Sequence, residues 1–157
     1  MVDEMVKVLV VYDTKYGNTK LVAEKIVEGI SEVEGVETAI SDVEEVNLEK
    51  VADYDAIWIG SPSHIGISAR SIRKFIDKLG KLDLKAKWVA VFDTYLVGDF
   101  EKAVKKMEKR IGEKVPGLKL MIPGLSIKVG GTKGPILDEE LPKCKDFGRK
   151  IATQLKT

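Results

Sequence analysis

The chain alternates between two hydrophobic periodicities. Val6–Tyr12 is an almost unbroken run of apolar, mostly β-branched residues, which is typical of a strand buried on both faces of a parallel sheet. From Thr19 the period changes to that of a helix, with charged residues on the other face and Gly35 after the last apolar position. The apolar positions of this helix are Val22, Ile26, Ile30 and Val33. The N-terminal region is therefore predicted to be a strand followed by a helix.

The same unit repeats along the chain. Val36–Ile40 alternates apolar and polar residues as an edge strand does, and Asp55–Gly60 reads as a buried strand that Gly60-Ser61-Pro62 ends. Trp88–Phe92 is the next buried run. Two further helices are indicated by apolar residues at helical spacing, namely Ile72, Phe75, Ile76 and Leu79, and then Phe100, Ala103, Val104, Met107 and Ile111.

The C-terminal third is less regular. Leu118–Val129 contains two short apolar runs separated by Pro123-Gly124, and the fifth strand is one or both of them. A last helix follows, with Pro142 in its first turn, where proline is tolerated. Five strands alternating with helices predict a doubly wound parallel sheet with helices on both faces. At 157 residues and 17.4 kDa, we expect one domain over residues 1–157.

Charge argues against a nucleic-acid binder. The formal net charge is +1, yet residues 1–80 carry 9 basic and 15 acidic side chains, and residues 81–157 carry 17 and 10. The only dense basic cluster is Lys102, Lys105, Lys106, Lys109 and Arg110, which we interpret as a solvated helix face. The acid-rich stretch is interpreted as a solvated face or a docking face; it comprises Glu32, Glu34, Glu37, Asp42, Glu44, Glu45 and Glu49.

Composition sets the expected location. The longest apolar run is far shorter than the roughly 20 residues that span a bilayer, and no leader pattern opens the chain. One cysteine, Cys144, with one histidine, His64, predicts neither an internal disulfide nor a structural metal site. We therefore expect a cytoplasmic protein without a membrane partner. Scarce Asn and Gln beside abundant Lys and Glu suggest a thermophilic source.

Ligand chemistry is expected in the loops that follow the strands, because doubly wound sheets bind ligands beyond the carboxyl ends of their strands. The loop Asp13–Thr19 runs directly into a helix, so its hydroxyls, its amide and the free N–H groups of the helix start could hold a phosphate. The alternative is that Thr14, Asn18 and Thr19 only turn the chain and cap the helix. One glycine is too few for a dinucleotide or triphosphate loop, so a phosphate monoester fits best.

Three loops and the last predicted helix of this sequence resemble those of the flavodoxin family. Thr14-Lys15-Tyr16-Gly17-Asn18-Thr19 is similar to the phosphate loop of flavodoxins, Gly60–Gly66 to their second flavin-contacting loop, and Phe92–Tyr95 with Gly98 to their third. The ending Asp146–Ala152 resembles the last helix of the flavodoxin module in A-type flavoproteins. The resemblance implies a five-stranded sheet in the order 2-1-3-4-5 and bound flavin mononucleotide (FMN).

It also implies where FMN contacts the chain: the phosphate on residues 14–19, and the isoalloxazine ring between the other two loops. Tyr95 is the candidate for one flank of the ring, and His64 with Ile65 stands where many flavodoxins have tryptophan. The cofactor-binding residues implied are Thr14, Lys15, Tyr16, Gly17, Asn18, Thr19, Ser61, Pro62, Ser63, His64, Ile65, Gly66, Asp93, Thr94, Tyr95 and Gly98.

Several other residues are assigned to the core or left without a catalytic role. Trp58, Trp88 and Cys144 lie within predicted elements and are expected to pack there. A response regulator is excluded, because the third strand ends in Gly60-Ser61-Pro62 where a phospho-accepting Asp is needed. No Ser-His-Asp set can be named. We predict no catalytic residue and no metal ligand.

Three functions remain open at this stage. The first is an electron carrier that moves electrons between redox partner proteins through FMN, as a monomer. The second is an FMN-dependent NAD(P)H:quinone or flavin reductase, whose oligomer contacts would complete the pocket. The third is a binding module that keeps the fold without redox traffic. A binding module would take up no flavin, a reductase would be reduced by NADPH, and an electron carrier would bind flavin without being reduced by NADPH.

Overall fold

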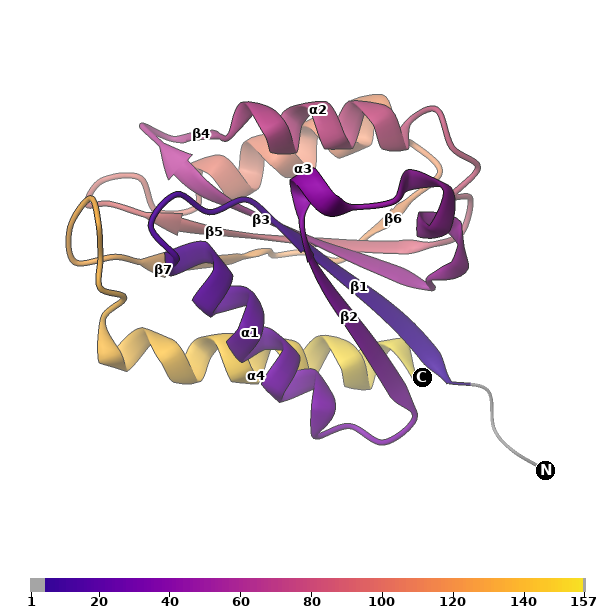
Figure 1. The fold of residues 1–157 in the computed structure, drawn as a ribbon, viewed down its shortest axis with the longest axis horizontal. Coiled ribbons are helices and arrows are strands. Elements are labelled where there is room, and N and C mark those ends of the chain that lie inside the picture. The colour runs from indigo at the N-terminus through magenta and orange to yellow at the C-terminus, as the bar shows by residue number, and fades with distance from the viewer. Residues whose placement is uncertain (1–4, 157) are drawn as a thin grey trace.

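In a computed structural model, which describes residues 5–156, a central sheet separates two layers of helices (Figure 1). The strands are β1 Val6–Tyr12, β2 Val36–Asp42, β3 Ala56–His64, β4 Ile67–Ser68, β5 Trp88–Tyr95, β6 Lys119–Leu120 and β7 Leu125–Lys128. The α-helices are α1 Asn18–Ser31, α2 Arg70–Leu79, α3 Lys102–Lys114 and α4 Leu141–Leu155. Short 3₁₀ turns are η1 Val43–Glu45, η2 Leu48–Asp53 and η3 Asp138–Glu140.

The strand order confirms the predicted topology. The parallel path runs β2-β1-β3-β5-β6, β7 also pairs with β5 in parallel, and β4 forms a short antiparallel hairpin with β3. β6 pairs with the start of β5 and β7 with its end. The two apolar runs around Pro123 thus form one interrupted fifth strand, since proline lacks the N–H that a continuous ladder needs. Both runs are used, and the order is 2-1-3-4-5.

Two hydrophobic clusters lie on opposite faces of this sheet. Side chains alternate along a strand, so Val8 and Val10 of β1 pack towards α1 and α4, whereas Leu9 and Val11 pack towards α2 and α3. Figure 1 shows α2 and α3 on one side of the sheet and α1 and α4 on the other. This double coverage explains why β1 is almost entirely apolar.

α1 and α4 approach each other through glycines. A Cβ atom on Gly29 would collide with the Lys145 carbonyl oxygen, and one on Gly148 would collide with the Ile26 carbonyl oxygen. The missing side chains therefore let the two backbones touch, which fixes the position of α1. Gly148 lies within the C-terminal segment that resembles A-type flavoproteins.

The predicted ends of β3 and β5 and the predicted start of α3 are wrong; β5 continues past Phe92 to Tyr95. Gly60-Ser61-Pro62 does not end the third strand, because Ser61 pairs with Asp93 and Pro62 with Thr94 in the parallel ladder before the hairpin to β4 forms. Phe100 is not in α3 but precedes it, with 58% of its surface exposed. Glu101 between them has a left-handed backbone, φ 60°, so the helix can begin only after it.

The three expected packing residues behave differently. Trp58 is fully buried in β3, which confirms its core assignment. Trp88 is half-buried at the start of β5, where the Lys119 ammonium lies 5.0 Å from the ring centroid. Cys144 is buried in α4, and burial raises the pKa of its thiol to about 12. Within residues 5–156, no helix combines the length and apolar character needed to cross a membrane.

Candidate functional site

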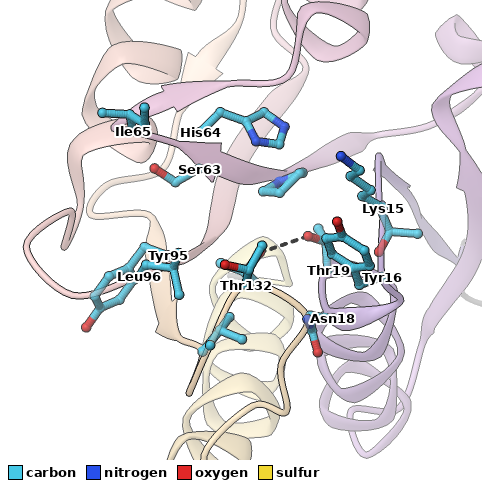
Figure 2. A pocket seen from close by; sticks show the side chains of 15 residues that line it. Lys15, Tyr16, Asn18, Thr19, Ser63, His64, Ile65, Tyr95, Leu96 and Thr132 are labelled. Carbon is cyan, nitrogen blue, oxygen red and sulfur yellow. Dashed lines mark hydrogen bonds between the residues drawn. The ribbon is translucent and has the colours of Figure 1, made fainter.

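A cavity of about 310 Å³ opens at the carboxyl edge of the sheet. Four segments from different parts of the chain line it: the β1–α1 loop, the β3–β4 hairpin, the end of β5 and the loop after β7 (Figure 2). The lining residues are Thr14, Lys15, Tyr16, Asn18, Thr19, Pro62, Ser63, His64, Ile65, Thr94, Tyr95, Leu96, Val129, Gly131 and Thr132. The cavity lies where the order of the strands reverses around β1 and β3, the ligand position in doubly wound sheets.

The first end of the cavity is the start of α1. Gly17 is the N-cap residue with φ 88°, and no side chain caps the helix, so Thr14, Asn18 and Thr19 do not cap it as the alternative predicted, although Thr14 does brace the turn before it. Thr14 Oγ1 instead accepts a hydrogen bond from the Gly17 N–H at 3.0 Å, which leaves the hydroxyl proton of Thr14 free to donate. The N–H groups of the first helical turn therefore face the cavity without a side-chain competitor.

Thr19 ties this end to the centre of the sheet. Its Oγ1 lies 2.9 Å from Thr94 Oγ1, a hydrogen bond that the dashed line in Figure 2 marks. Both threonines are buried, at 1% and 5% exposed. Because the bond joins the first turn of α1 to the end of β5, it sets the distance between the two walls of the cavity.

Positive charge gathers beside the same end. The Lys15 ammonium lies 5.4 Å and the Lys133 ammonium 6.0 Å from the centroid of the Tyr16 ring. Both lysines are exposed; Lys15 lines the cavity, and Lys133 reaches the Tyr16 ring from the loop after β7 without lining the cavity. Together with the dipole of α1 they make this end of the cavity an anion site.

The second end of the cavity begins with the turn between β3 and β4. His64 pairs with Ile67, so Ile65 and Gly66 form a two-residue hairpin turn with φ 52° and 81°. Such a turn favours Asn-Gly, and a β-branched residue with positive φ is strained. Ser63 Oγ accepts the Gly66 N–H at 3.1 Å and braces the turn. The Ile65 side chain is 90% exposed.

The end of β5 supplies the opposite flank. Tyr95 and Leu96 line the cavity, and the Phe100 ring meets the Tyr95 ring edge-on at 5.5 Å between centroids. This contact limits the motion of the Tyr95 ring. Burial is the main cause that raises the pKa of the Tyr95 phenol, with Glu140 adding to it. Tyr95 therefore stays neutral near pH 7 and presents an uncharged aromatic surface.

Five of the residues implied by the resemblance do not line the cavity: Gly17, Ser61, Gly66, Asp93 and Gly98. Gly17 and Gly66 form the turns that shape it, with positive φ at both. Ser61 is buried, and its Oγ accepts the Ala69 N–H at 2.8 Å and donates to the Pro62 carbonyl. Gly98 lies in an exposed loop, and nothing lies within 4 Å of the position that a Cβ would take there.

Asp93 supports the second end from beneath. Its carboxylate is fully buried, accepts from Ser126 Oγ at 2.6 Å and accepts the Val104 N–H, in the first turn of α3, at 3.0 Å. Burial raises the pKa of Asp93 to about 7, against the two hydrogen bonds, which lower it. Asp93 thus positions α3 and β7 rather than touching a ligand in the cavity.

Four lining residues were missed by the sequence analysis: Leu96, Val129, Gly131 and Thr132. The signal for Gly131 and Thr132 was present, because Gly130-Gly131-Thr132 comes shortly after the final strand and the carboxyl ends of parallel strands meet at one edge. Gly134 in the same loop approaches so closely that a Cβ would lie 2.6 Å from Asn18 Oδ1. The loop therefore packs onto the start of α1.

At the end of the cavity opposite the anion site, Ile65 on one side and Tyr95 and Leu96 on the other form an apolar slot. A doubly wound sheet with an anion site and an apolar slot at its switch point is typical of proteins that bind a phosphorylated aromatic ligand. A family model described as "Flavodoxin domain" matches residues 9–127. The chain belongs to the flavodoxin family, and proteins of this family bind FMN.

Related proteins agree with this assignment. The chain is 41% identical over 73 residues to a flavodoxin of Aquifex aeolicus, covering 46% of this chain and 40% of that protein. It is 29% identical over 153 residues to the type A flavoprotein fprA of Rhodobacter capsulatus, covering 94% of this chain and 33% of that protein. The chain thus spans well under half the length of these two relatives.

A solved structure matches over its full length. A flavodoxin from the domain Archaea superposes with a TM-score of 0.83 at 29% identity, covering 97% of this chain and 100% of that chain. FMN suits the cavity described above, because its phosphate matches the uncapped start of α1 and its flat ring matches the slot between the β3–β4 turn and Tyr95.

Proposed function

We propose that this chain is an electron carrier that binds FMN in the cavity and passes electrons between redox partner proteins. The observation that carries the proposal is the start of α1, whose N–H groups have no side-chain cap and open on the cavity beside Thr14 and Asn18. A single sheet with two helical layers supports one FMN-binding domain over residues 1–157.

The phosphate would lie on the β1–α1 loop. The Thr14 hydroxyl and the first-turn N–H groups donate to phosphate oxygens, and the α1 dipole favours the negative charge. Lys15 and Lys133 neutralise part of that charge from the mouth of the cavity. Thr19 acts indirectly, since its hydrogen bond to Thr94 holds the loop at its distance from β5.

The ring would lie between the β3–β4 turn and Tyr95. FMN supplies one- and two-electron redox chemistry when bound. Tyr95 offers an aromatic stacking surface on one side, and Ile65 offers an aliphatic one on the other, where many flavodoxins have tryptophan. Leu96 and Val129 exclude water from part of the slot. Ile65 is exposed at the mouth, which would leave an edge of the ring within reach of a partner.

Anaerobic visible spectroscopy tests the proposal. The purified protein is titrated with FMN, and the loaded protein is then reduced with dithionite and, in a separate sample, with NADPH. We expect stoichiometric uptake of FMN, reduction by dithionite, and no reduction by NADPH within minutes. Rapid bleaching by NADPH would identify a reductase instead, and failure to take up FMN would refute both functions.

A further inference from the structure

The helical layer formed by α2 and α3 is strongly basic. The two helices lie on the same side of the sheet (Figure 1) and together carry ten basic and three acidic side chains. Neither has an acidic residue in its first turn. Both helices run antiparallel to the strands, so their N-termini lie at the edge of the sheet that holds the cavity. The positive dipole ends of both helices and the basic residues of their first turns therefore lie at that edge, together with Asp99 and Glu101 beside α3.

The cations of α3 form one exposed row. Its members are Lys102, Lys105, Lys106 and Lys109, at positions i, i+3, i+4 and i+7, and all four are exposed. Lys102 pairs with Asp99 at 3.4 Å and Lys105 with Glu101 at 3.8 Å. Both pairs lie at the surface, where they are worth little. The excess charge of the row thus faces solvent.

α2 continues the basic surface. Arg70, Lys74 and Lys78 recur at i, i+4 and i+8 and line a groove of about 400 Å³ against the segment 43–48. Glu44 is the acidic residue that shares this groove with them. Three cations against one carboxylate leave this side of α2 positive as well.

Part of this charge does not stabilise the helices. Lys102 and Lys105 pair with Asp99 and Glu101, and Lys78 and Lys114 lie in last turns, where a cation favours the helix dipole. Lys106 and Lys109 are exposed and lie four residues after Lys102 and Lys105, a spacing at which like charges repel. An exposed excess of positive charge attracts a negatively charged partner surface.

An apolar patch borders the basic surface at the cavity. Ile65 is 90%, Val97 79% and Phe100 58% exposed. Ile65 and Leu96 line the cavity, so the patch surrounds the place where the ring edge would emerge. A Cβ on Gly66 would lie 3.1 Å from Lys102 Cδ, which shows that the β3–β4 turn touches the basic row directly. The two surfaces are therefore continuous.

We propose that the apolar patch and the basic α2–α3 surface together dock an acidic redox protein. The inference rests on the proposed function and names the charge of its partner. Protein interfaces combine an apolar centre with a charged rim, and complementary charge speeds association. A nucleic acid could use the lysines and stack a base on Phe100, but it would leave the exposed aliphatic side chains of Ile65 and Val97 without a partner, so an acidic protein accounts for more of the surface.

A reduced [2Fe–2S] ferredoxin of net negative charge is the probe, and a basic cytochrome c is the opposite-charge control. Two ferredoxins, each oxidised by one electron, reduce one FMN, which takes its protons from water. In the control, FMN reduced by dithionite passes electrons to ferric cytochrome c. Stopped-flow absorbance gives both second-order rates between low salt and about 0.5 M salt. We expect the ferredoxin rate to fall with salt and the cytochrome c rate to stay level or rise.

Charge-reversed variants locate the surface. In Lys106→Glu/Lys109→Glu, two exposed lysines of α3 outside the cavity are reversed, and Lys150→Glu on α4 is the control on the opposite helical layer. We expect the double variant to lower the low-salt ferredoxin rate about tenfold, and Lys150→Glu to leave it within about twofold. Calorimetric titration of the oxidised, FMN-loaded protein with oxidised ferredoxin should show the same order of affinities, since no electron can be transferred between two oxidised partners.

FMN affinity and reduction by dithionite distinguish this proposal from the proposed function, because both must be unchanged in the double variant. If the wild-type protein does not bind FMN, the proposed function itself is refuted. Intact FMN binding with equal salt responses for ferredoxin and cytochrome c would overturn the docking proposal alone. So would equal effects of the α3 and α4 variants, or tighter retention of an RNA oligonucleotide than of ferredoxin at 0.15 M salt.

Discussion

The two ends of the cavity are built in different ways. The phosphate end rests on regular structure: the first turn of α1, the buried pair Thr19 and Thr94, and the glycine contact between α1 and α4. The ring end rests on turns, with a strained Ile65 at 90% exposure on one side and the loop after Tyr95 on the other. Rigidity is thus concentrated where an anion would be held, and exposure where electrons would leave.

This difference places the affinity for FMN at one end of the cavity and electron exchange with partners at the other. A phosphate held by N–H groups and hydroxyls on a fixed helix supplies binding energy that does not depend on the redox state of the ring. Side chains in the turns at the ring end can be substituted without weakening the binding of the phosphate. A substitution at one end should therefore leave the other end intact.

Gly148→Ala should disturb the support of the phosphate end. The new Cβ meets the Ile26 carbonyl oxygen, so α1 and α4 must separate, and we expect the free energy of unfolding to fall by about 3 kcal/mol. FMN affinity should fall with it, because α1 moves. Gly112→Ala on α3 is the control: nothing lies within 4 Å of its Cβ direction, and alanine should stabilise the helix by up to about 1 kcal/mol. Equal urea midpoints for the two variants would contradict this account.

Asp93→Asn tests the support beneath the ring end. The folded-state pKa of about 7 lies above the unfolded value of about 3.9. The wild-type carboxyl therefore favours the folded state at low pH, and that stability is lost as the pH rises from about 4 to about 7. Relative to Asp93→Asn, we expect wild type to lose on the order of 2 kcal/mol between pH 4 and pH 8.

Urea unfolding at both pH values measures this difference. Asp53→Asn, at an exposed carboxyl, is the matched control and should track wild type within a few tenths of a kcal/mol. Parallel pH profiles for wild type and Asp93→Asn would show that Asp93 ionises normally.

Thr14→Val tests the phosphate end without touching the ring end. It removes a hydroxyl donor and the acceptor of the Gly17 N–H. We expect FMN to bind about tenfold more weakly, the cost of one hydrogen bond to a charged group, while riboflavin binding is unchanged. Thr14→Ser should retain most of the wild-type affinity. Equal weakening of FMN and riboflavin would place Thr14 at the ring instead.

Ile65→Asn tests the ring end without touching the phosphate end. Asparagine adopts the left-handed conformation more easily, so we expect the free energy of unfolding to rise by about 1 kcal/mol. FMN and riboflavin should both weaken, by the same small factor, because the aliphatic flank is lost. Val97→Asn changes a residue of similar exposure that does not line the cavity, and should alter neither affinity.

Most of the fold could be predicted because each strand and helix is indicated by the hydrophobic pattern within its own segment of the chain. A fully apolar β1, helical spacing from Thr19 and the break at Pro123 each predict one element, and alternation of strands with helices leaves few topologies. The ends of β3 and β5 were misplaced, since Pro62 and Thr94 continue the ladder through pairing between residues about 30 positions apart. No local signal reports such a pairing.

The site was predictable where a loop follows a strand directly. Residues 14–19 all lie at the start of α1, as expected, although whether they capped the helix could not be decided from composition. Asp93 looked like a loop residue but is buried, because its neighbour in space, Ser126, is 33 positions away. Thr132 was missed because the break at Pro123-Gly124 left the end of the fifth strand undefined, so the loop after that strand was not assigned to the cavity edge.

The contribution of the phosphate to flavin binding can be measured in one titration. Apoprotein is titrated with FMN and, separately, with riboflavin, which has the same ring without the phosphate, and flavin fluorescence reports binding. If the start of α1 holds the phosphate, FMN should bind at least about 100-fold more tightly, a difference of about 3 kcal/mol. Equal affinity for the two flavins would contradict the account, because it would mean that the phosphate lies outside the cavity.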